Sequence, residues 1–459
     1  MSVDVKALFD RALDLHQRGR DDEATKAYME LLQHDVRNLG ALTNVGTLLY
    51  NGGHRSAAMV AYRQAVACHP QNVPARVNLA NALYDAQDYH GAQDEYVAAL
   101  AVDPYYAQAH QGLSYVLDRM GDTEGARRHR DLGFRESPIT HVPYRGSERA
   151  IMVLLLVSAR GGNISTDRFL DDRVFFVTKL FADYFDPAGH VPFHAFVFNA
   201  IGEADLCGDA LEAAAALVKR TNAAVVNPPE LVARTGRVEN ARRLAHLPGV
   251  VTPLTTTFAR ERLRQPGAAE LLAREGFTFP LLLRTPGFHT GMHFVFATRP
   301  EDVAEAAQTL PGEELTAIAF LDARGADGLY RKYRVMTIDG KLYPLHLAIS
   351  ASWKVHYFSA GMAEAPERRD EERRFLDDAA AAIGPRAIAA LEAIAATIGL
   401  DYGGIDFGID PHGNVLLFET NATMMVPTPE VDPRFAYRRP AVERIHAAVR
   451  AMLLERAAR

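Results

Sequence analysis

Apolar and small residues in the first 135 positions follow a repeating helical pattern. Gly19, Gly53 and Gly121 lie on a period of 34 residues, and Gln87 stands where that period has no glycine. Five residues after each comes an alanine, and in the first three units a tyrosine follows at a fixed spacing. Such a period predicts pairs of antiparallel helices stacked in a solenoid. The units are expected to begin near residues 5, 39, 73 and 107.

The fixed residues of this repeat predict its packing. The alanines let the two helices of a unit approach, the tyrosines fill the gap to the next unit, and the glycines permit the turn. Arg130 replaces the tyrosine of the fourth unit, which suggests a polar terminal cap. The marks resemble the tetratricopeptide repeat over residues 1–135. That resemblance implies a groove for a peptide or a segment of a partner protein, without naming the ligand.

A different pattern begins after residues 136–148, which contain two prolines and no periodicity and are interpreted as a linker. Strands and helices then alternate, which predicts an α/β layer over 149–235. Beyond it, strands predominate, with two helical regions and a closing helix. The strands of the layer are expected at 150–159, 194–205 and 223–230, and helices near 165–184, 209–221, 237–249, 300–309 and 367–399.

The stretch YGGIDFGIDPHGNVLLFETNAT predicts a β-hairpin with a central His-Gly turn. In that register Asp406 lies opposite Glu419, and Asn421 shares the face of Glu419. Two facing carboxylates repel each other, and a divalent cation would remove the repulsion. Oxygen ligands without His or Cys suit Mg²⁺. The alternative is another register, in which Asp406 points to solvent.

This Asp–Glu–Asn spacing, with glycine in the turn, resembles the metal-binding hairpin of the ATP-grasp superfamily. The stretch is similar to that of ribosomal-protein glutamate ligases and glutathione synthetases, and D-alanine–D-alanine ligase shares the spacing. The resemblance implies an α/β pre-ATP-grasp domain over 149–235 and an α+β ATP-grasp domain over 236–459. It also implies that Asp406, Glu419 and Asn421 hold magnesium ions on ATP.

Other nucleotide contacts are implied by the same resemblance. Arg237 and Arg284 stand where the family has ATP-contacting lysines, in a chain with far more arginine than lysine, and Gly291 lies in the phosphate loop. Taken alone, each arginine is more often a surface charge, so their order along the chain carries the assignment. The second loop glycine of the family is replaced by His293.

Residues 314–325 resemble the hinge strand whose backbone recognises adenine, which implies nucleotide contacts at Phe320 and Leu321. Lys332 is a further expected contact, since lysine is rare in this chain. Arg334 matches the arginine that glutamate ligases place near the transferred phosphate or the acyl phosphate.

Substrate contacts are expected on two segments. Lys354 and His356 lie just after Trp353, the only tryptophan of the chain. In the family the corresponding segment covers the substrate. This segment departs from the glutamate-ligase pattern, so their amino-acid substrate cannot be transferred, and a packed surface loop is the alternative. Asn199 and Asp205 end a predicted strand and are expected to face the cleft, because open sheets bind ligands at strand carboxyl ends.

The net charge of −7 argues against a general binder of nucleic acid or of anionic membranes, although it permits a local phosphate site. Two distant cysteines fit a reducing compartment. The N-terminus has no apolar signal region, and the apolar runs fall short of the roughly 20 residues that span a bilayer. A cytoplasmic location is expected.

Three functions remain open. The first is an ATP- and Mg²⁺-dependent ligase that joins a carboxylate to an amine through an acyl phosphate, with the repeats recruiting a peptide substrate or partner. The second is a phosphotransferase with a hydroxyl acceptor. The third is a scaffold in which the repeats bind a partner and the second part only senses nucleotide or is inactive.

Overall fold

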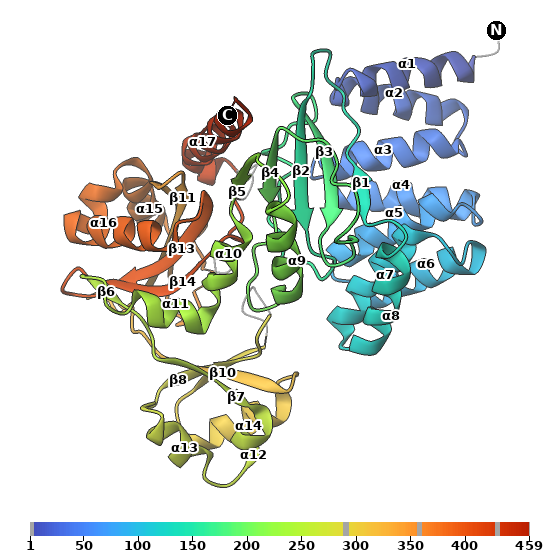
Figure 1. The fold of residues 1–459 in the computed structure, drawn as a ribbon. Helices are drawn as coiled ribbons and strands as arrows, with labels where there is room; N and C mark the ends of the chain where they lie inside the picture. The colour runs from blue at the N-terminus through green and yellow to red at the C-terminus, as the bar shows by residue number, and fades with distance from the viewer. Residues whose placement is uncertain (1–3, 288–292, 356–359, 427–431, 459) are drawn as a thin grey trace. The chain divides into compact units, whose positions relative to one another are not determined.

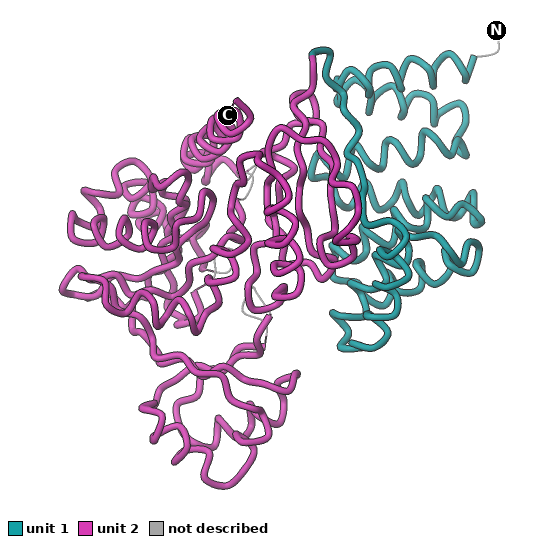
Figure 2. The backbone as a smooth tube through the Cα atoms, viewed as in Figure 1, with its two compact units in different colours: residues 1–148 teal, residues 149–459 magenta. Residues whose placement is uncertain are grey.

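A computed structural model describes residues 4–287, 293–355, 360–426 and 432–458. The chain divides into two compact units, residues 1–148 and 149–459 (Figure 2). Gly291 and His356 lie outside the described residues.

The first unit is an array of helices in pairs (Figure 1). The first helix of each pair begins at Val5, Leu39, Val73 or Ala107, where the period of 34 predicted it. The helical-repeat prediction is therefore confirmed. A short strand, β1 (Ile139–His141), lies within the segment interpreted as a linker. The helices are α1 (Val5–Gln17), α2 (Asp21–His34), α3 (Leu39–Asn51), α4 (Arg55–Cys68), α5 (Val73–Asp85), α6 (Tyr89–Val102), α7 (Ala107–Met120) and α8 (Thr123–Phe134).

The turn inside each pair needs a left-handed backbone residue. Gly19, Gly53 and Gly121 have φ angles of 66°, 84° and 85°, and Gln87 has a φ of 63°. Glycine adopts this conformation without a steric penalty, whereas other residues pay roughly 1 kcal/mol or more. The third turn therefore has the same left-handed geometry, although Gln87 stands there in place of a glycine.

The regularly spaced tyrosines fill the space between helices, as predicted. Tyr28, Tyr62 and Tyr96 are almost fully buried. Each hydroxyl bonds to a polar side chain of a neighbouring helix, such as Asn81, 2.5 Å from the Tyr96 oxygen. Arg130, which stands in place of the tyrosine in the fourth and last unit, is only 6% exposed and pairs with Asp118 of α7.

The second unit begins with a parallel layer in the strand order β3-β2-β4-β5. The helix expected near 165–184 is wrong: seven of these residues form β3, which pairs with β2 along its whole length. Residues 175–181 are buried or partly buried throughout, as expected for a strand inside a parallel sheet. The elements are β2 (Ile151–Val157), β3 (Phe175–Phe181), β4 (Phe196–Asn199), α9 (Gly208–Val218), β5 (Ala224–Val226), α10 (Pro229–Val232), η1 (Ala233–Thr235) and α11 (Arg237–Leu244).

A small antiparallel sheet, ordered β7-β10-β8-β9, follows. Leu281, Leu283 and Ala317 point to the face that joins the apolar core with three helices. Arg284 and Thr316 alternate with them and therefore share the opposite face. The elements are β7 (Thr255–Ala259), α12 (Arg260–Arg264), α13 (Ala268–Arg274), β8 (Leu281–Arg284), β9 (Phe294–Ala297), α14 (Pro300–Thr309) and β10 (Glu314–Ala319).

A larger sheet, ordered β12-β11-β13-β14-β6, carries the predicted hairpin. Tyr333 of this sheet packs on Phe375 of α15, so the helices cover the face opposite to its neighbours Lys332 and Arg334. The elements are β6 (Val250–Val251), β11 (Tyr330–Ile338), β12 (Lys341–Ser350), α15 (Pro366–Asp377), α16 (Ala379–Ile398), β13 (Tyr402–Ile409), β14 (Val415–Asn421), η2 (Pro433–Arg438) and α17 (Arg439–Ala458).

Helix α16 has the length and composition of a membrane span. Its backbone breaks at Gly384, where φ is 82° and ψ is 160°, and Pro385 follows. Leu391 and Ile394 on one face of it are fully buried, whereas several of its alanines are exposed. The helix therefore fits the core of a folded domain.

The hairpin has the predicted register at the end away from its turn. Asp406 pairs with Glu419. Nearer the turn, Phe407 pairs with Leu417, so Phe418 is an extra residue on β14. Such a bulge inserts one residue into a strand and shifts the pairing beyond it. The pairing of the two carboxylates therefore depends on this bulge.

We expect Gly112→Ala to destabilise the repeat array. A Cβ atom at this position of α7 would lie 2.2 Å from the Tyr96 ring. Overpacking of this kind typically costs about 1–3 kcal/mol, which urea unfolding of the full chain followed by circular dichroism measures. Gly208→Ala is the control, because nothing lies within 4 Å of its added methyl group. Equal stability of both variants would contradict the packing described.

Candidate functional site

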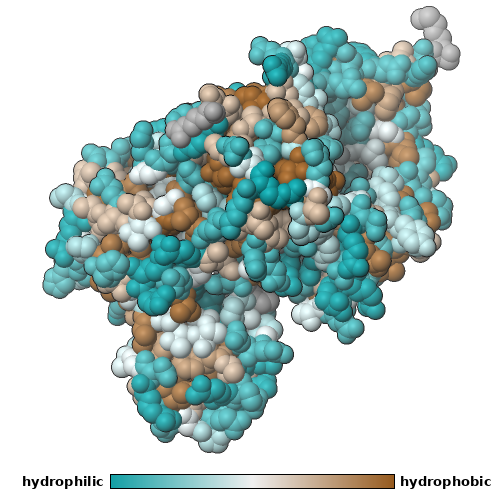
Figure 3. Space-filling view, viewed as in Figure 1, coloured by the Kyte–Doolittle hydropathy of each residue, from teal (hydrophilic) through white to brown (hydrophobic). Residues whose placement is uncertain are grey.

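A cavity in the second unit lies between the uncovered face of the small sheet and the end of β14. Thr316 and Ile318 of β10 and Arg284 of β8 form one side, and residues 417–421 form another. The start of α11 and the loop after β4 close it. The surface in Figure 3 is hollowed where the part that carries β7–β10 meets the rest of this unit.

A row of polar side chains crosses the larger sheet on its uncovered face. His346 pairs with Arg334, Arg334 with Asp406, and Asp406 with Glu419, from β12 through to β14. Directly paired residues point to the same face. The predicted catalytic arginine and the predicted metal ligands are thus brought together by strand register.

Asp406 is engaged by two cations. Its side chain is only 1% exposed, and its oxygens accept from Arg334 Nε at 2.5 Å and Arg334 Nη2 at 2.8 Å. Lys332 Nζ lies 2.7 Å away. Burial raises the pKa of the Asp406 carboxyl, but Arg334 and Lys332 outweigh it and hold the pKa far below its usual range. The carboxylate therefore stays ionised at neutral pH.

His346, at the other end of the row, is held neutral. Burial first, and then the neighbouring Arg334, lower the pKa of its imidazole well below the ordinary value. The net charge of the row is therefore set by its carboxylates and its cations, since this imidazole adds none.

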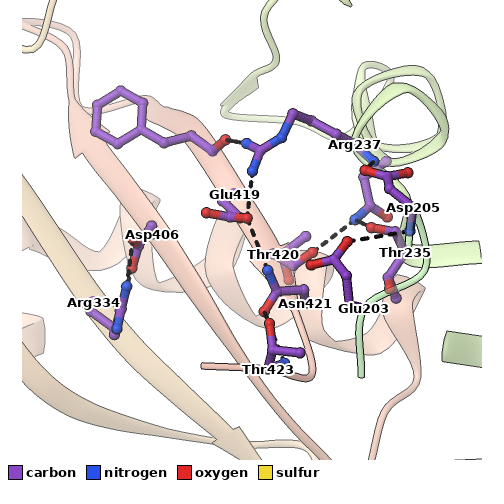
Figure 4. A network of polar contacts seen from close by, with 12 residues as sticks. Glu203, Asp205, Thr235, Arg237, Arg334, Asp406, Glu419, Thr420, Asn421 and Thr423 are labelled. Atoms are coloured by element: carbon purple, nitrogen blue, oxygen red, sulfur yellow. Dashed lines mark hydrogen bonds and ion pairs between the residues drawn. The ribbon is translucent and has the colours of Figure 1, made fainter. Parts of the chain in front are cut away.

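Glu419 and Asn421 form a second hydrogen-bonded group (Figure 4). Arg237 Nη2 lies 2.5 Å from Glu419 Oε1, which also accepts from Asn421 Nδ2 at 3.0 Å. Asn421 Oδ1 accepts from the backbone N–H and the hydroxyl of Thr423, each at 3.0 Å. These bonds fix the amide of Asn421 with its oxygen toward Thr423.

Arg284 lies near three acidic residues from two parts of the chain, the loop after β4 and β14. Burial and the nearby Arg237 lower the pKa of its guanidinium, while Glu419, Glu203 and Asp205 oppose that shift. The cavity thus gathers two arginines and three carboxylates. Strand β4 leads into the loop that carries two of these acids, so the first layer of the unit contributes directly to the site.

Asn199 does not face the cavity, contrary to expectation. It is fully buried, and its side-chain amide donates to the Asn227 carbonyl at 2.9 Å. Asn227 in turn bonds both the N–H and the C=O of Tyr402, each at 2.8 Å. Asn199 therefore supports the junction between the parallel layer and β13.

Six further predicted site residues are not among those that line the cavity: Lys332, Arg334 and Asp406, which belong to the row on the larger sheet, and Phe320, Leu321 and Lys354. Phe320 and Leu321 follow the end of β10, where Phe320 packs on Phe296 with ring centroids 4.9 Å apart. Phe296 also stacks on Trp353 at 4.9 Å. Lys354 is exposed, and its backbone N–H bonds Ser352 at 3.3 Å. Ile318, two residues before Phe320, lines the cavity instead.

Glu203 and Asn240 also line the cavity, although neither was predicted to do so. Asn240 Nδ2 donates to the carbonyls of Thr235 and Thr420, both at 2.8 Å, and is 5% exposed. Asn240 stands three residues after Arg237 on α11, which places both on one helix face. That spacing was the only signal in the sequence for Asn240.

The donor atoms fit a hard cation in type. Asp406, Glu419 and Asn421 supply carboxylate and amide oxygens, which Mg²⁺ prefers. Within the described ranges no group of three or more His, Cys, Asp or Glu is placed to hold a metal. An ion here would therefore depend on the amide oxygen of Asn421 and on ligands from water or substrate, and it would displace existing ion pairs and the hydrogen bonds from Thr423 to that oxygen.

No family model matches this chain, and no curated protein matches it. Among solved structures, MamA is 24% identical over 28% of this chain and 74% of its own, with a TM-score of 0.27. PilF of Pseudomonas aeruginosa is 20% identical over 29% of this chain and 61% of its own, also with a TM-score of 0.27. Scores this low carry no argument, so the repeat assignment rests on the helices themselves.

We expect Arg334→Met to lower stability and to shift acid unfolding to higher pH. The depressed pKa of Asp406 contributes stability that is present above its unfolded pKa of about 4 and is lost as pH falls through the folded pKa. Removing Arg334 raises that folded pKa, so the loss begins at higher pH. Breaking a buried pair typically costs about 3–5 kcal/mol, and Lys332 reduces this to roughly 2 kcal/mol.

The measurement is denaturant unfolding between pH 3 and pH 7, the range of ordinary carboxyl titration. Arg373→Met is the control, because Arg373 forms an exposed ion pair with Asp370. Identical pH profiles for wild type and Arg334→Met would refute the role given to this pair.

Proposed function

We propose that the second unit is an ATP-grasp ligase that forms an amide bond between a carboxylate and an amine and releases ADP. The observation that supports it most is one cavity in which Glu419 and Asn421 of the larger sheet approach Arg284 of the smaller one. Nucleotide-dependent transfer needs oxygen ligands for a cation and fixed positive charge for phosphates at one place, and this cavity has both.

Arg237 and Arg284 are the residues proposed to hold the phosphates of ATP. Guanidinium groups present planar donors that match phosphate oxygens, and they act more strongly in a site shielded from water. Arg237 already bonds Glu419, and Arg284 lies in the field of the same carboxylate. Phosphate binding would therefore rearrange charges that are present and paired.

Asp406, Glu419 and Asn421 are the residues proposed to hold Mg²⁺. When bound, the ion would neutralise charge on phosphate oxygens. The chain also supplies Arg334 and Lys332, which share the sheet face with Asp406, and a cation bound there would compete with them for that carboxylate. They would then bind the carboxylate substrate or its acyl phosphate.

No covalent enzyme intermediate is needed for this reaction. The residues of the cavity orient two substrates and exclude water, and positioning of this kind accounts for a large share of catalysis in such transfers. The helical repeats are proposed to recruit a peptide substrate or a partner protein in their groove. A scaffold function, with repeats as the active part, is the alternative that the repeat array favours.

Purified protein is expected to release ADP when ATP, Mg²⁺ and a suitable acid and amine are supplied from a panel. Glu419→Gln should lower this rate about a hundredfold or more, because it weakens the proposed site of the Mg²⁺ that would neutralise charge on the phosphate oxygens. Glu392→Gln, on the exposed side of α16, is the control and should retain the wild-type rate. Equal release by wild type and Glu419→Gln would refute the ligase, and a phosphorylated product without an amide would assign a phosphotransferase.

Deleting residues 1–135 tests the proposed recruiting role. We expect KM for the true carboxylate or amine substrate to rise while turnover at saturation is retained, because the deleted part binds substrate without touching the reacting atoms. Steady-state kinetics of both proteins measures this. Unchanged kinetics would favour docking into a complex. The scaffold would be favoured if neither protein is active and only the full chain captures the partner.

A further inference from the structure

We propose that the cavity wall formed by Glu203, Asp205 and Asn240 binds the amine substrate as an ammonium ion, and that Asp205 takes the proton that the amine loses before attack. This inference rests on the proposed ligase function and names the chemistry of its second substrate. The three residues come from the loop after β4 and from α11, away from the row that crosses the larger sheet.

Asn240 presents an acceptor that no described residue satisfies. Its nitrogen is used by the carbonyls of Thr235 and Thr420, so the orientation of the amide is fixed. Its Oδ1 is buried and has no hydrogen-bond partner among the described residues, and Asn240 lines the cavity. An unmet buried acceptor destabilises the folded state. A ligand that brings an N–H donor would offset that destabilisation.

The loop after β4 is held against the end of β14 by a close backbone approach. A Cβ atom on Gly202 would lie 2.7 Å from Thr423 Cγ2 and 3.1 Å from the Thr423 nitrogen. Only glycine permits this contact, and it brings the next acid, Glu203, into the cavity with Asn421. The acidic wall is therefore built into the fold rather than carried on a free surface.

Glu203 and Asp205 have different positions in that wall. Glu203 is 7% exposed, whereas Asp205 is exposed at the mouth. Asp205 Oδ2 accepts from the backbone N–H of Arg237 at 3.3 Å, which orients it at the start of α11. A ligand that enters from solvent meets Asp205 first and Glu203 with Asn240 further in.

The charges of the cavity favour a cation beside the phosphates. Three carboxylates, those of Glu203, Asp205 and Glu419, face two arginines, Arg237 and Arg284, which leaves one net negative charge among the described lining residues. Phosphate oxygens are acceptors and are repelled by this wall. An ammonium group offers three donors and one positive charge, and therefore matches it.

The proton step balances. The ammonium R–NH₃⁺ gives one proton to the Asp205 carboxylate, which leaves R–NH₂ with a lone pair. That lone pair attacks the acyl carbon, the C–N bond forms, the bond from carbon to the phosphate oxygen breaks, and the amine's second proton leaves with the phosphate as HPO₄²⁻. Desolvation at the cavity mouth and the adjacent Glu203 raise the pKa of Asp205, which favours this transfer.

The test is binding of small ammonium probes to the full chain, measured by saturation-transfer NMR with methylammonium, L-alaninamide and putrescine. Asp205→Asn keeps an oxygen that can cap α11 while removing the charge, so the fold is preserved. Asp209→Asn is the control, because its side chain is 88% exposed and lies four residues further on. N-acetyl-L-alaninamide, which has no ammonium group, is the control ligand.

We expect at least one ammonium probe to bind wild type and Asp209→Asn, and Asp205→Asn or Glu203→Gln to weaken it about tenfold, as expected for loss of a charged hydrogen bond. Affinity for a non-hydrolysable ATP analogue with Mg²⁺, measured on the same samples, should stay unchanged. Absence of binding by every probe, equal binding by Asp205→Asn, or a loss confined to the nucleotide would overturn the proposal.

The two proposals can fail separately. Probe binding that depends on Asp205, together with no binding of the ATP analogue, would retain the ammonium site and reject the ligase. Binding of the analogue without any probe binding would do the reverse.

Discussion

The contact between Asp406 and its two cations is the constraint on which the rest of the site depends. A buried carboxylate facing a second one across a ladder is costly unless positive charge compensates it. Arg334 and Lys332 supply that charge from the adjacent strand, and Arg237 does the same for Glu419. The strands that carry this row must therefore pair in the observed register, because a shift would separate the carboxylates from the cations that compensate them.

This arrangement unites parts of the chain that are far apart in sequence. The loop after β4, the start of α11, the end of β8 and the end of β14 meet in one cavity. Asn199 and Asn227 tie the parallel layer to β13, because their side-chain amides donate to backbone carbonyls. The layer thus serves as a wall of the site as well as a support, and its acids and the arginines of the other elements share one electrostatic environment.

The sequence predicted the local features well. The repeat could be found because each unit satisfies the same backbone and packing demands, and the pairing of Asp406 with Glu419 followed from the hairpin turn, with the bulge at Phe418 preserving it. Features set by distant contacts were missed. Glu203 and Asn240 gain their roles only through folding, and the inward orientation of Asn199 depends on Asn227. The strand at 175–181 was taken for a helix because a short apolar run does not fix its period.

The stacking of Trp353 on Phe296 joins the segment after β12 to the edge strand β9 of the small sheet. The chain has no other tryptophan. Its intrinsic emission therefore reports on a single joint between two sheets of the same unit. A change in the spacing of those sheets would register optically without any label.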